Sequence, residues 1–379
     1  MHTRVLCNRR HFLKAGLIGT VTGLLGRNPV SAESPSAPLS PVALTSGADR
    51  RENLLRALEL VKREILRAAH GKRILLKPNM VNYDGDWGAN AELSSSHFEQ
   101  LEIVADWFRH LGFRDMVVAE STPNGMTLEG FETLGYTNLD RKLPLVFKDL
   151  NQEGYKLLNI NGTYPDVRIS RLILDDSYFR VSLAKLKTHN NVALTFSGKN
   201  IFMCSPIIDV KNFSKQGGRS DKSRMHGSTN QHLHDNLFLL AHNGIRPDLA
   251  VIDGFEGMEG EGPCWGDPVP SHLAVVSTDW LACDRVCCEL VQVEKQLQSI
   301  GLTPELPAYL RYCAQAGMGA FSLEQIELRG EPLDGLCRQY KLHDDVAGMI
   351  GMDPDAPIYR TGPAEVSSDQ GKVAPPLRM

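Results

Sequence analysis

The sequence predicts an α/β fold with a mainly parallel sheet, flanking helices and a long polar insertion loop. Two short apolar runs, 73–76 and 116–119, predict buried strands, and apolar residues recur at helical spacing between them, over 101–111. Gly112 is placed to end that helix. A strand, a helix and a strand in this order form a βαβ unit with parallel strands. The composition, 42% hydrophobic and 23% charged residues, is that of a globular protein.

The remaining elements follow from the same patterns, taken from the amino terminus onward. Helical spacing predicts a helix over 51–69, directly before the first strand. Further apolar runs predict strands at 145–147, 169–174, 178–183, 249–252, 273–276 and 324–328. Helical spacing returns at 279–293 and 304–316. The stretch 214–236 is polar and contains paired glycines, so we expect a long loop there.

The first 32 residues predict an export signal that precedes the fold. They combine a basic head, a short apolar segment at 15–25, and Val30 and Ala32 at the −3 and −1 positions of a cleavage site. The segment Arg9-Arg10-His11-Phe12-Leu13-Lys14 resembles the twin-arginine export motif. We therefore expect the twin-arginine export machinery as a partner and a periplasmic location.

The apolar segment is too short for a stable membrane span, so none is expected in the mature form. This gives the following organisation: a signal peptide at 1–32, a linker at 33–50, an α/β domain at 51–352 and a polar Pro-rich tail at 353–379.

The charge balance excludes a general attraction to nucleic acid. The chain carries 41 basic and 45 acidic residues, a formal charge of −4, and residues 1–32 hold five basic residues and no acidic one. Removal of the signal therefore lowers the charge to −9. A small anion must then bind at a local basic cluster, against an unfavourable overall field.

The cysteine pattern argues against a ferredoxin-type cluster. Seven cysteines follow residue 32, and no two of them have Cys-x-x-Cys spacing. Cys283, Cys287 and Cys288 fall on a predicted helix, where we expect them to pack in the core.

Basic side chains follow two of the predicted strands. Lys77-Pro78-Asn79 ends the first strand, and Lys185, Lys187 and His189 alternate along the strand that begins at 178. Alternation places these three side chains on one side of an extended strand. Because ligands of open parallel sheets bind at the carboxyl ends of the strands, this pattern predicts a site for a carboxylate or phosphate. An ordinary turn and a solvated strand face are the structural alternatives.

The polar stretch adds further basic groups, among them Arg219, Lys222, Arg224 and His226. A basic loop of this kind can close over an anion. His232 and His234 would lie on one side of a strand, where they could ligate a metal, although isolated histidines are more often structural.

Acidic residues cluster after the strand at 249–252. Asp253, Glu256 and Glu259 lie in a glycine-rich turn, and their oxygens would suit a divalent metal such as Mg²⁺, Ca²⁺ or Mn²⁺. A paired carboxylate could instead act as a general base, and a solvated turn is the structural alternative.

In their order along the chain, these motifs resemble the domain of unknown function 362 family. The resemblance covers roughly residues 71–330 and rests on Lys77-Pro78-Asn79, Lys185-Leu186-Lys187-Thr188-His189, Lys199-Asn200, Asp253-Gly254, Met258-Glu259-Gly260-Glu261-Gly262-Pro263, Asp279 with Asp284, and Gly317-Met318-Gly319. It implies no established reaction. Some relatives carry a ferredoxin-like cysteine module, whose motif this chain lacks.

Two functions fit these observations. The first is an exported enzyme that acts on a small anionic substrate, with Lys187 and His189 as catalytic residues. The substrate would be bound by Lys77, Asn79, Lys185, Lys199, Asn200 and His226, and a metal by Asp253, Glu256 and Glu259. The second is a periplasmic anion-binding or accessory protein without catalysis. A cofactor-dependent redox protein is a weaker third alternative. The substrate, the metal and the oligomeric state stay open.

Overall fold

The computed structural model describes residues 39–81, 91–160, 166–209, 218–293, 295–296 and 307–343. The expected signal peptide and the polar tail lie outside the described residues. All described residues belong to one compact unit.

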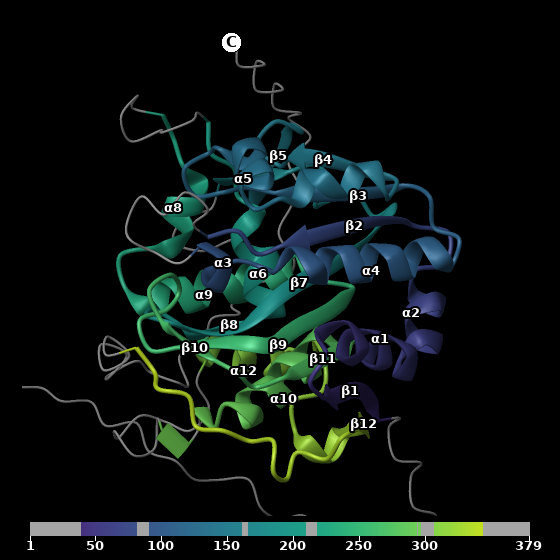
Figure 1. The fold of residues 1–379 in the computed structure, drawn as a ribbon. Helices are drawn as coiled ribbons and strands as arrows, with labels where there is room; N and C mark the ends of the chain where they lie inside the picture. Colours follow the sequence, from purple (N-terminus) through teal and green to yellow (C-terminus); the bar gives the residue numbers. More distant parts are fainter. Residues whose placement is uncertain are drawn as a thin grey trace, which may run out of the picture. The chain divides into compact units, whose positions relative to one another are not determined.

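One large sheet organises the described part of the chain (Figure 1). Its ten strands are β1 (Ser40–Ser46), β2 (Arg73–Pro78), β3 (Met116–Glu120), β4 (Leu145–Asp149), β7 (Tyr178–His189), β8 (Ala193–Thr195), β9 (Leu249–Glu259), β10 (Asp267–Val269), β11 (Leu273–Ser277) and β12 (Ile326–Gly330). Their order is β12-β1-β11-β9-β7-β2-β3-β4, with β10 paired to β9 and β8 to β7. A separate two-stranded sheet joins β5 (Tyr155–Asn159) to β6 (Asp166–Ser170).

The centre of the sheet is parallel, as predicted. Each neighbouring pair in the run β9-β7-β2-β3-β4 is parallel, whereas β11 pairs antiparallel with both β9 and β1. The predicted βαβ unit is confirmed, with Leu75 of β2 opposite Val117 of β3. The carboxyl ends of β2, β3 and β7 therefore meet at one edge.

Helices flank this sheet. They are α1 (Arg50–Leu60), α2 (Lys62–Ala68), α3 (Ala91–Ser94), α4 (Phe98–His110), α5 (Thr127–Thr133), α6 (Ser197–Cys204), α8 (Asp221–His226), α9 (Asn230–His242), α10 (Trp280–Leu290) and α12 (Ala308–Gln315), with 3-10 turns η1 (Tyr136–Arg141) and η2 (Leu323–Gln325). Within the described ranges, no helix is long and apolar enough to span a bilayer.

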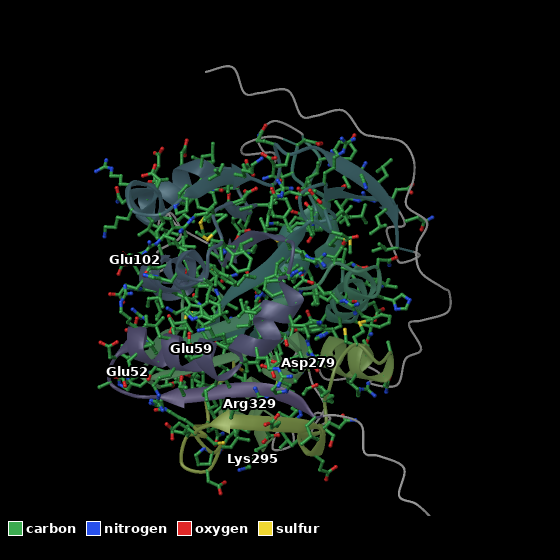
Figure 2. The ribbon with its side chains drawn as sticks, turned by 90° about the vertical axis from the view of Figure 1, so that its right-hand side faces the viewer. Glu52, Glu59, Glu102, Asp279, Lys295 and Arg329 are labelled. Carbon is green, nitrogen blue, oxygen red and sulfur yellow. The ribbon has the colours of Figure 1, made fainter. Side chains whose placement is uncertain are left out.

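Two apolar cores lie on opposite faces of the sheet. Ile74 and Leu76 of β2 pack in the core that α1, α2, α4 and α5 cover. Leu75 points the other way, into the core that α6, α9, α10 and α12 cover and that includes Cys283. This alternation follows from the period of two along a strand. Figure 2 labels Glu59 and Glu102, which lie on α1 and α4, two of the helices that cover the first core.

Several predicted segments differ from the structure. The strand predicted at 169–174 ends at Ser170 in β6, and the helix predicted over 51–69 is divided at Val61 into α1 and α2. Residues 40–46, expected in a linker, form β1, whose Val42, Ala43 and Leu44 are fully buried between β11 and β12. The polar stretch expected as a loop contains α8 and the start of α9. Both helices have capping side chains, since Ser220 accepts a hydrogen bond from the Ser223 amide and Thr229 from the His232 amide.

Candidate functional site: a lysine-rich pocket at the strand ends

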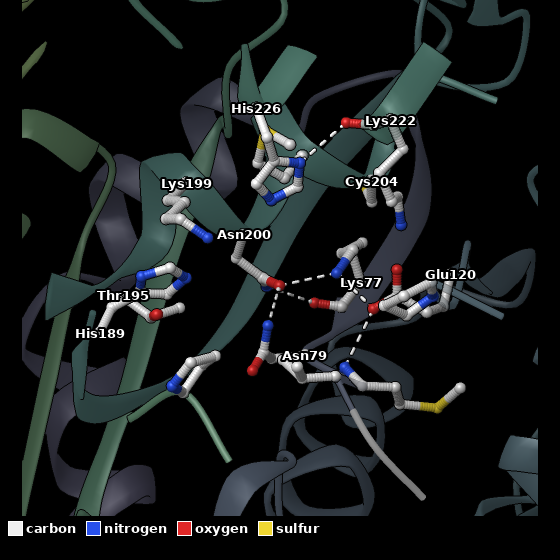
Figure 3. A pocket seen from close by; sticks show the side chains of 15 residues that line it. Lys77, Asn79, Glu120, His189, Thr195, Lys199, Asn200, Cys204, Lys222 and His226 are labelled. Carbon is white, nitrogen blue, oxygen red and sulfur yellow. Dashed lines mark hydrogen bonds and ion pairs between the residues drawn. The ribbon is translucent and has the colours of Figure 1, made fainter. Parts of the chain in front are cut away.

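A pocket of about 130 Å³ lies where the central parallel strands end (Figure 3). Lys77 is the next-to-last residue of β2, and Glu120 and His189 are the last residues of β3 and β7. The helices α6 and α8 complete the lining with Lys199, Asn200, Cys204, Lys222 and His226. The pocket thus occupies the position where open α/β sheets bind their ligands.

A buried ion pair forms one wall of the pocket. Lys77 and Glu120 are each 2% exposed, and the Lys77 Nζ atom lies 2.5 Å from Glu120 Oε2. The carboxylate also accepts hydrogen bonds from the backbone amides of Met80, at 3.1 Å, and Ser121, at 2.7 Å. Because both charges are paired and hydrogen-bonded, the interior tolerates them.

Two asparagines connect this wall to α6. The Asn200 Oδ1 atom accepts hydrogen bonds from Lys77 Nζ at 2.6 Å and from Asn79 Nδ2 at 3.1 Å, and its amide nitrogen donates to Ser182 Oγ at 3.0 Å. This arrangement orients the Asn79 amide. Its Oδ1 atom is buried and has no hydrogen-bond partner in the part of the chain that the structure describes. A ligand with a proton to donate would satisfy that oxygen.

The first turn of α6 is held by a buried carboxylate from α10. Asp284 accepts hydrogen bonds from the Ser197 amide and hydroxyl, at 3.0 and 2.6 Å, and from the Gly198 amide at 3.0 Å. Burial raises the pKa of Asp284 to about 7, although these hydrogen bonds oppose the rise. Asp284 thereby fixes the turn that carries Lys199 and Asn200.

Lys199 is buried, and its ammonium group has no polar partner among the described residues. Its side chain is 7% exposed, and no described residue forms a hydrogen bond or ion pair with its ammonium group. Burial lowers its pKa to about 7, and the positive charges of Lys222 and Lys77 lower it further in the same direction. The pocket therefore contains one cation that a bound anion could neutralise.

Two histidines with complementary ring protonation face the same space. The His189 Nδ1 atom accepts a hydrogen bond from the Asn191 amide at 3.0 Å, which places the proton of the neutral ring on Nε2. His226 Nδ1 lies 2.9 Å from the Lys222 carbonyl oxygen, so it donates, and its Nε2 carries a lone pair. Figure 3 shows both rings pointing toward the end of Lys199.

Both histidines are held in the neutral form. Burial lowers the pKa of His189 well below its usual value, and the charge of Lys199 adds to this effect. Burial and Lys199 also lower the pKa of His226, to about 4. At neutral pH the pocket thus offers one ring as a hydrogen-bond donor and the other as an acceptor.

The two lysines of β7 point to α3. Lys185 Nζ lies 3.4 Å from the Glu92 carbonyl oxygen, and Lys187 Nζ donates to the carbonyl oxygens of Ser94 and Pro263, the latter at 3.2 Å. Both lie on one side of the strand, as predicted. Neither lines the pocket, although burial lowers the pKa of Lys187 to about 7.

The predicted metal ligands are spread along β9. Asp253 is 2% exposed and its carboxylate lies 3.2 Å from Arg50 Nε, whereas Glu256 is exposed. Glu259 accepts a hydrogen bond from the Lys341 amide at 2.9 Å. Among the described residues, no three His, Cys, Asp or Glu side chains are grouped as a metal site would require. A divalent metal at this turn stays a prediction.

The prediction that His232 and His234 lie on one side of a strand is wrong. His232 and His234 lie on α9, where residues two apart point to different sides, and not on a strand. His234 is fully buried, and its Nδ1 atom accepts a hydrogen bond from the Tyr309 amide at 3.2 Å.

The pocket brings together five of the six residues predicted to bind the substrate, namely Lys77, Asn79, Lys199, Asn200 and His226. Of the two residues predicted to be catalytic, His189 lines the pocket and Lys187 does not. Glu120 and Asp284 were not predicted as site residues, although Asp284 belongs to the motifs that carry the family resemblance. Glu120 could have been found, because it ends an apolar strand as Lys77 does. Asp284 does not end a predicted strand, and it contacts the start of α6 from α10, a helix distant in sequence.

Comparisons with known proteins agree with the resemblance found in the motifs. Residues 74–289 match the family described as "Domain of unknown function (DUF362)". A protein of Synechocystis sp. named as a thylakoid-associated protein is 25% identical over 224 residues. That match covers 59% of this chain and 64% of the relative, so the chain spans less than two thirds of the relative's length. No solved structure matches.

Proposed function

This chain belongs to the DUF362 family, and because the family description assigns no reaction, we propose a function from the pocket itself. The protein binds a small carboxylate or phosphate there and exchanges a proton with it. The observation that carries this proposal is Lys199, a buried ammonium group with no partner among the described residues.

The charges of the lining favour a bound anion. Lys77, Lys199 and Lys222 are basic, and Glu120 is the one acidic side chain among the described lining residues. The Glu120 carboxylate is already paired with Lys77, at 2.5 Å. An anion between Lys199 and Lys222 would therefore gain attraction in a site that excludes most water.

The two histidines supply the proton chemistry. The lone pair of His226 Nε2 can accept a proton from a bound substrate, and the Nε2 proton of His189 can donate a hydrogen bond to it. In this proposal His226, rather than Lys187, is the acid–base residue, because His226 lines the pocket, whereas Lys187 does not and donates to the carbonyl oxygens of Ser94 and Pro263.

Calorimetric titration with orthophosphate and oxalate tests the binding step. Lys199→Met should weaken the binding of at least one of these anions by about 10- to 100-fold, the size expected for a lost charge-assisted hydrogen bond. The matched control is Lys142→Met, because Lys142 is 69% exposed. Equal affinity in the wild type and the Lys199 variant would show that the pocket is not the anion site.

Product analysis separates an enzyme from a binding protein. The anions that raise the thermal midpoint of the wild type are incubated with it in deuterated water and followed by NMR. Exchange of a carbon-bound proton or formation of a product, lost in His226→Gln, supports catalysis. Binding without any exchange leaves the anion-binding protein as the function.

We also propose that the chain is exported by the twin-arginine route. The support comes from Arg9-Arg10-His11-Phe12-Leu13-Lys14 and the short apolar segment that follows. The mature protein would then bind its ligand in the periplasm.

A further inference from the structure

We propose that Lys199 forms an imine with a carbonyl group, which makes small 2-oxo acids and aldehyde acids the substrate class of this pocket. The inference rests on the proposed anion-binding function, because the carboxylate of such a molecule is the anion that the pocket would hold. It goes further by assigning a covalent role to one lysine.

Five buried lysines lie at or near the strand ends, and their contacts separate Lys199 from the rest. Lys77 is paired with a carboxylate, and Lys185, Lys187 and Lys222 each lie within hydrogen-bonding distance of a main-chain carbonyl oxygen. The nitrogen atoms of these four lysines are therefore each held by an acceptor of the protein. Lys199 has no such acceptor among the described residues, and Figure 3 shows its nitrogen directed into the pocket.

The surroundings of Lys199 favour a neutral amine, which is the nucleophilic form. It is 7% exposed, so its ammonium group loses most of its hydration. Its titratable neighbours across the pocket are Lys77 of β2, Glu120 of β3, His189 of β7, Lys222 and His226 of α8, and Cys204 of its own helix. Among these groups, Lys222 and Lys77 oppose the protonation of Lys199 and lower its pKa.

His226 is placed to move the protons that imine formation requires. The Lys199 nitrogen adds to the carbonyl carbon, and the carbonyl electron pair moves to the oxygen. His226 Nε2 takes a proton from the nitrogen and returns it to that oxygen. A second proton leaves the nitrogen as the C–O bond breaks, so both amine hydrogens depart in one water molecule and a C=N bond remains. His226 ends the step unchanged.

The size of the pocket limits the carbonyl compound. A volume of about 130 Å³ is well below the roughly 300–1,000 Å³ of pockets that hold drug-sized ligands, so the pocket suits a small carbonyl compound. Glyoxylate and pyruvate are of this size. Lys222 and the Nε2 proton of His189 are available for the carboxylate, and the carbinolamine hydroxyl can donate to the buried Asn79 Oδ1 atom.

Reductive trapping tests this inference on the full-length protein. Glyoxylate or pyruvate is added with cyanoborohydride near pH 7, and the adducts are located by peptide mass mapping. We expect at least about tenfold more adduct on Lys199 than on the exposed Lys142, because burial and two neighbouring lysines lower the pKa of Lys199 to about 7. Oxalate, which has no carbonyl of this kind but binds as an anion, should suppress the Lys199 adduct.

Two variants test whether the adduct is specific to Lys199. Lys199→Arg keeps the charge and cannot form the imine, so the selective adduct should disappear, whereas Lys142→Arg should leave it unchanged. Adduct formation on Lys199 at the level of Lys142 in the wild type would overturn the imine. If that occurs while oxalate binding still depends on Lys199, the anion pocket stands and the imine alone is wrong. If both fail, the proposed function fails with it.

Discussion

Replacement of Lys199 by methionine should make the protein more stable while it removes the ligand site. The pKa of this lysine is lowered from 10.5 to about 7, chiefly by burial. At about 1.4 kcal/mol per unit, retaining the charge at pH 7 costs the folded state at most about 5 kcal/mol. Methionine has a similar length and no charge, so we expect the free energy of unfolding to rise by about 1–4 kcal/mol.

The sign of the pH dependence is fixed by the direction of this shift. Above about pH 7 the unfolded chain binds more protons at this lysine than the folded chain does, so the stability of the wild type rises with pH. The variant lacks this contribution, and the difference between the two proteins should shrink toward pH 10. The titratable groups around this lysine are Lys77, Glu120, Lys187, His189, Cys204, Lys222, His226 and Cys264.

Urea unfolding followed by tryptophan fluorescence measures the effect, in Tris chloride without added oxyanions. Adding oxalate should stabilise the wild type by mass action and change the variant much less. A variant that is less stable than the wild type at pH 7, beyond the change caused by Lys142→Met, would refute the reasoning. It would mean that the Lys199 ammonium has a stabilising partner.

Four further predictions address the rest of the account. Lys77→Met should lower the free energy of unfolding by about 3–5 kcal/mol in urea, because it leaves the Glu120 carboxylate buried and unpaired; a loss below 1 kcal/mol contradicts this. Asp284→Asn should cost about 1–2 kcal/mol through the start of α6 and also weaken oxalate binding, and unchanged binding would limit Asp284 to a structural role. The double variant Arg9→Lys with Arg10→Lys should leave the precursor in the cytoplasm, as measured by cell fractionation. Continued export of this variant would exclude the twin-arginine route. Metal analysis of natively exported protein should find a divalent ion that Asp253→Asn removes, and protein free of metal would contradict the predicted site on β9.

Much of the fold could be predicted because the spacing of apolar residues within short segments determines its strands and helices. The strand at 73–76, the helix after it and the strand at 116–119 are each visible as apolar periodicity, and their order implies parallel pairing. β1 was missed because its pairing is distant in sequence. It lies between β11 and β12, and its short apolar centre next to Pro41 resembles a linker.

The helices of the polar stretch were missed for a different reason. α8 presents charged and polar side chains on most positions, and its Asp221 is buried through ion pairs with arginines rather than through apolar contacts. The helical spacing of apolar residues is therefore weak in α8. The capping residues Ser220 and Thr229 were the local signals that could have predicted the helix starts.

The pocket was predictable to the extent that strand ends determine it. Lys77 and His189 meet because parallel strands end at one edge. Alternation placed Lys185 and Lys187 on the same side of β7, but it could not show that α3 supplies carbonyl oxygens for both. Which lysine is left unpaired depends on contacts made by other elements, and for this reason the special position of Lys199 emerged only from the structure.

The most direct test of the central claim is a crystal structure with selenate, a dianion similar in size to phosphate. Anomalous scattering at the selenium edge locates the ion without reference to the protein. We expect a selenium peak within hydrogen-bonding distance of the Lys199 nitrogen and the His189 ring in the wild type, and no peak there in Lys199→Met. Selenate bound only at other positions, with the Lys199 pocket empty, would contradict the claim that this pocket is the anion site.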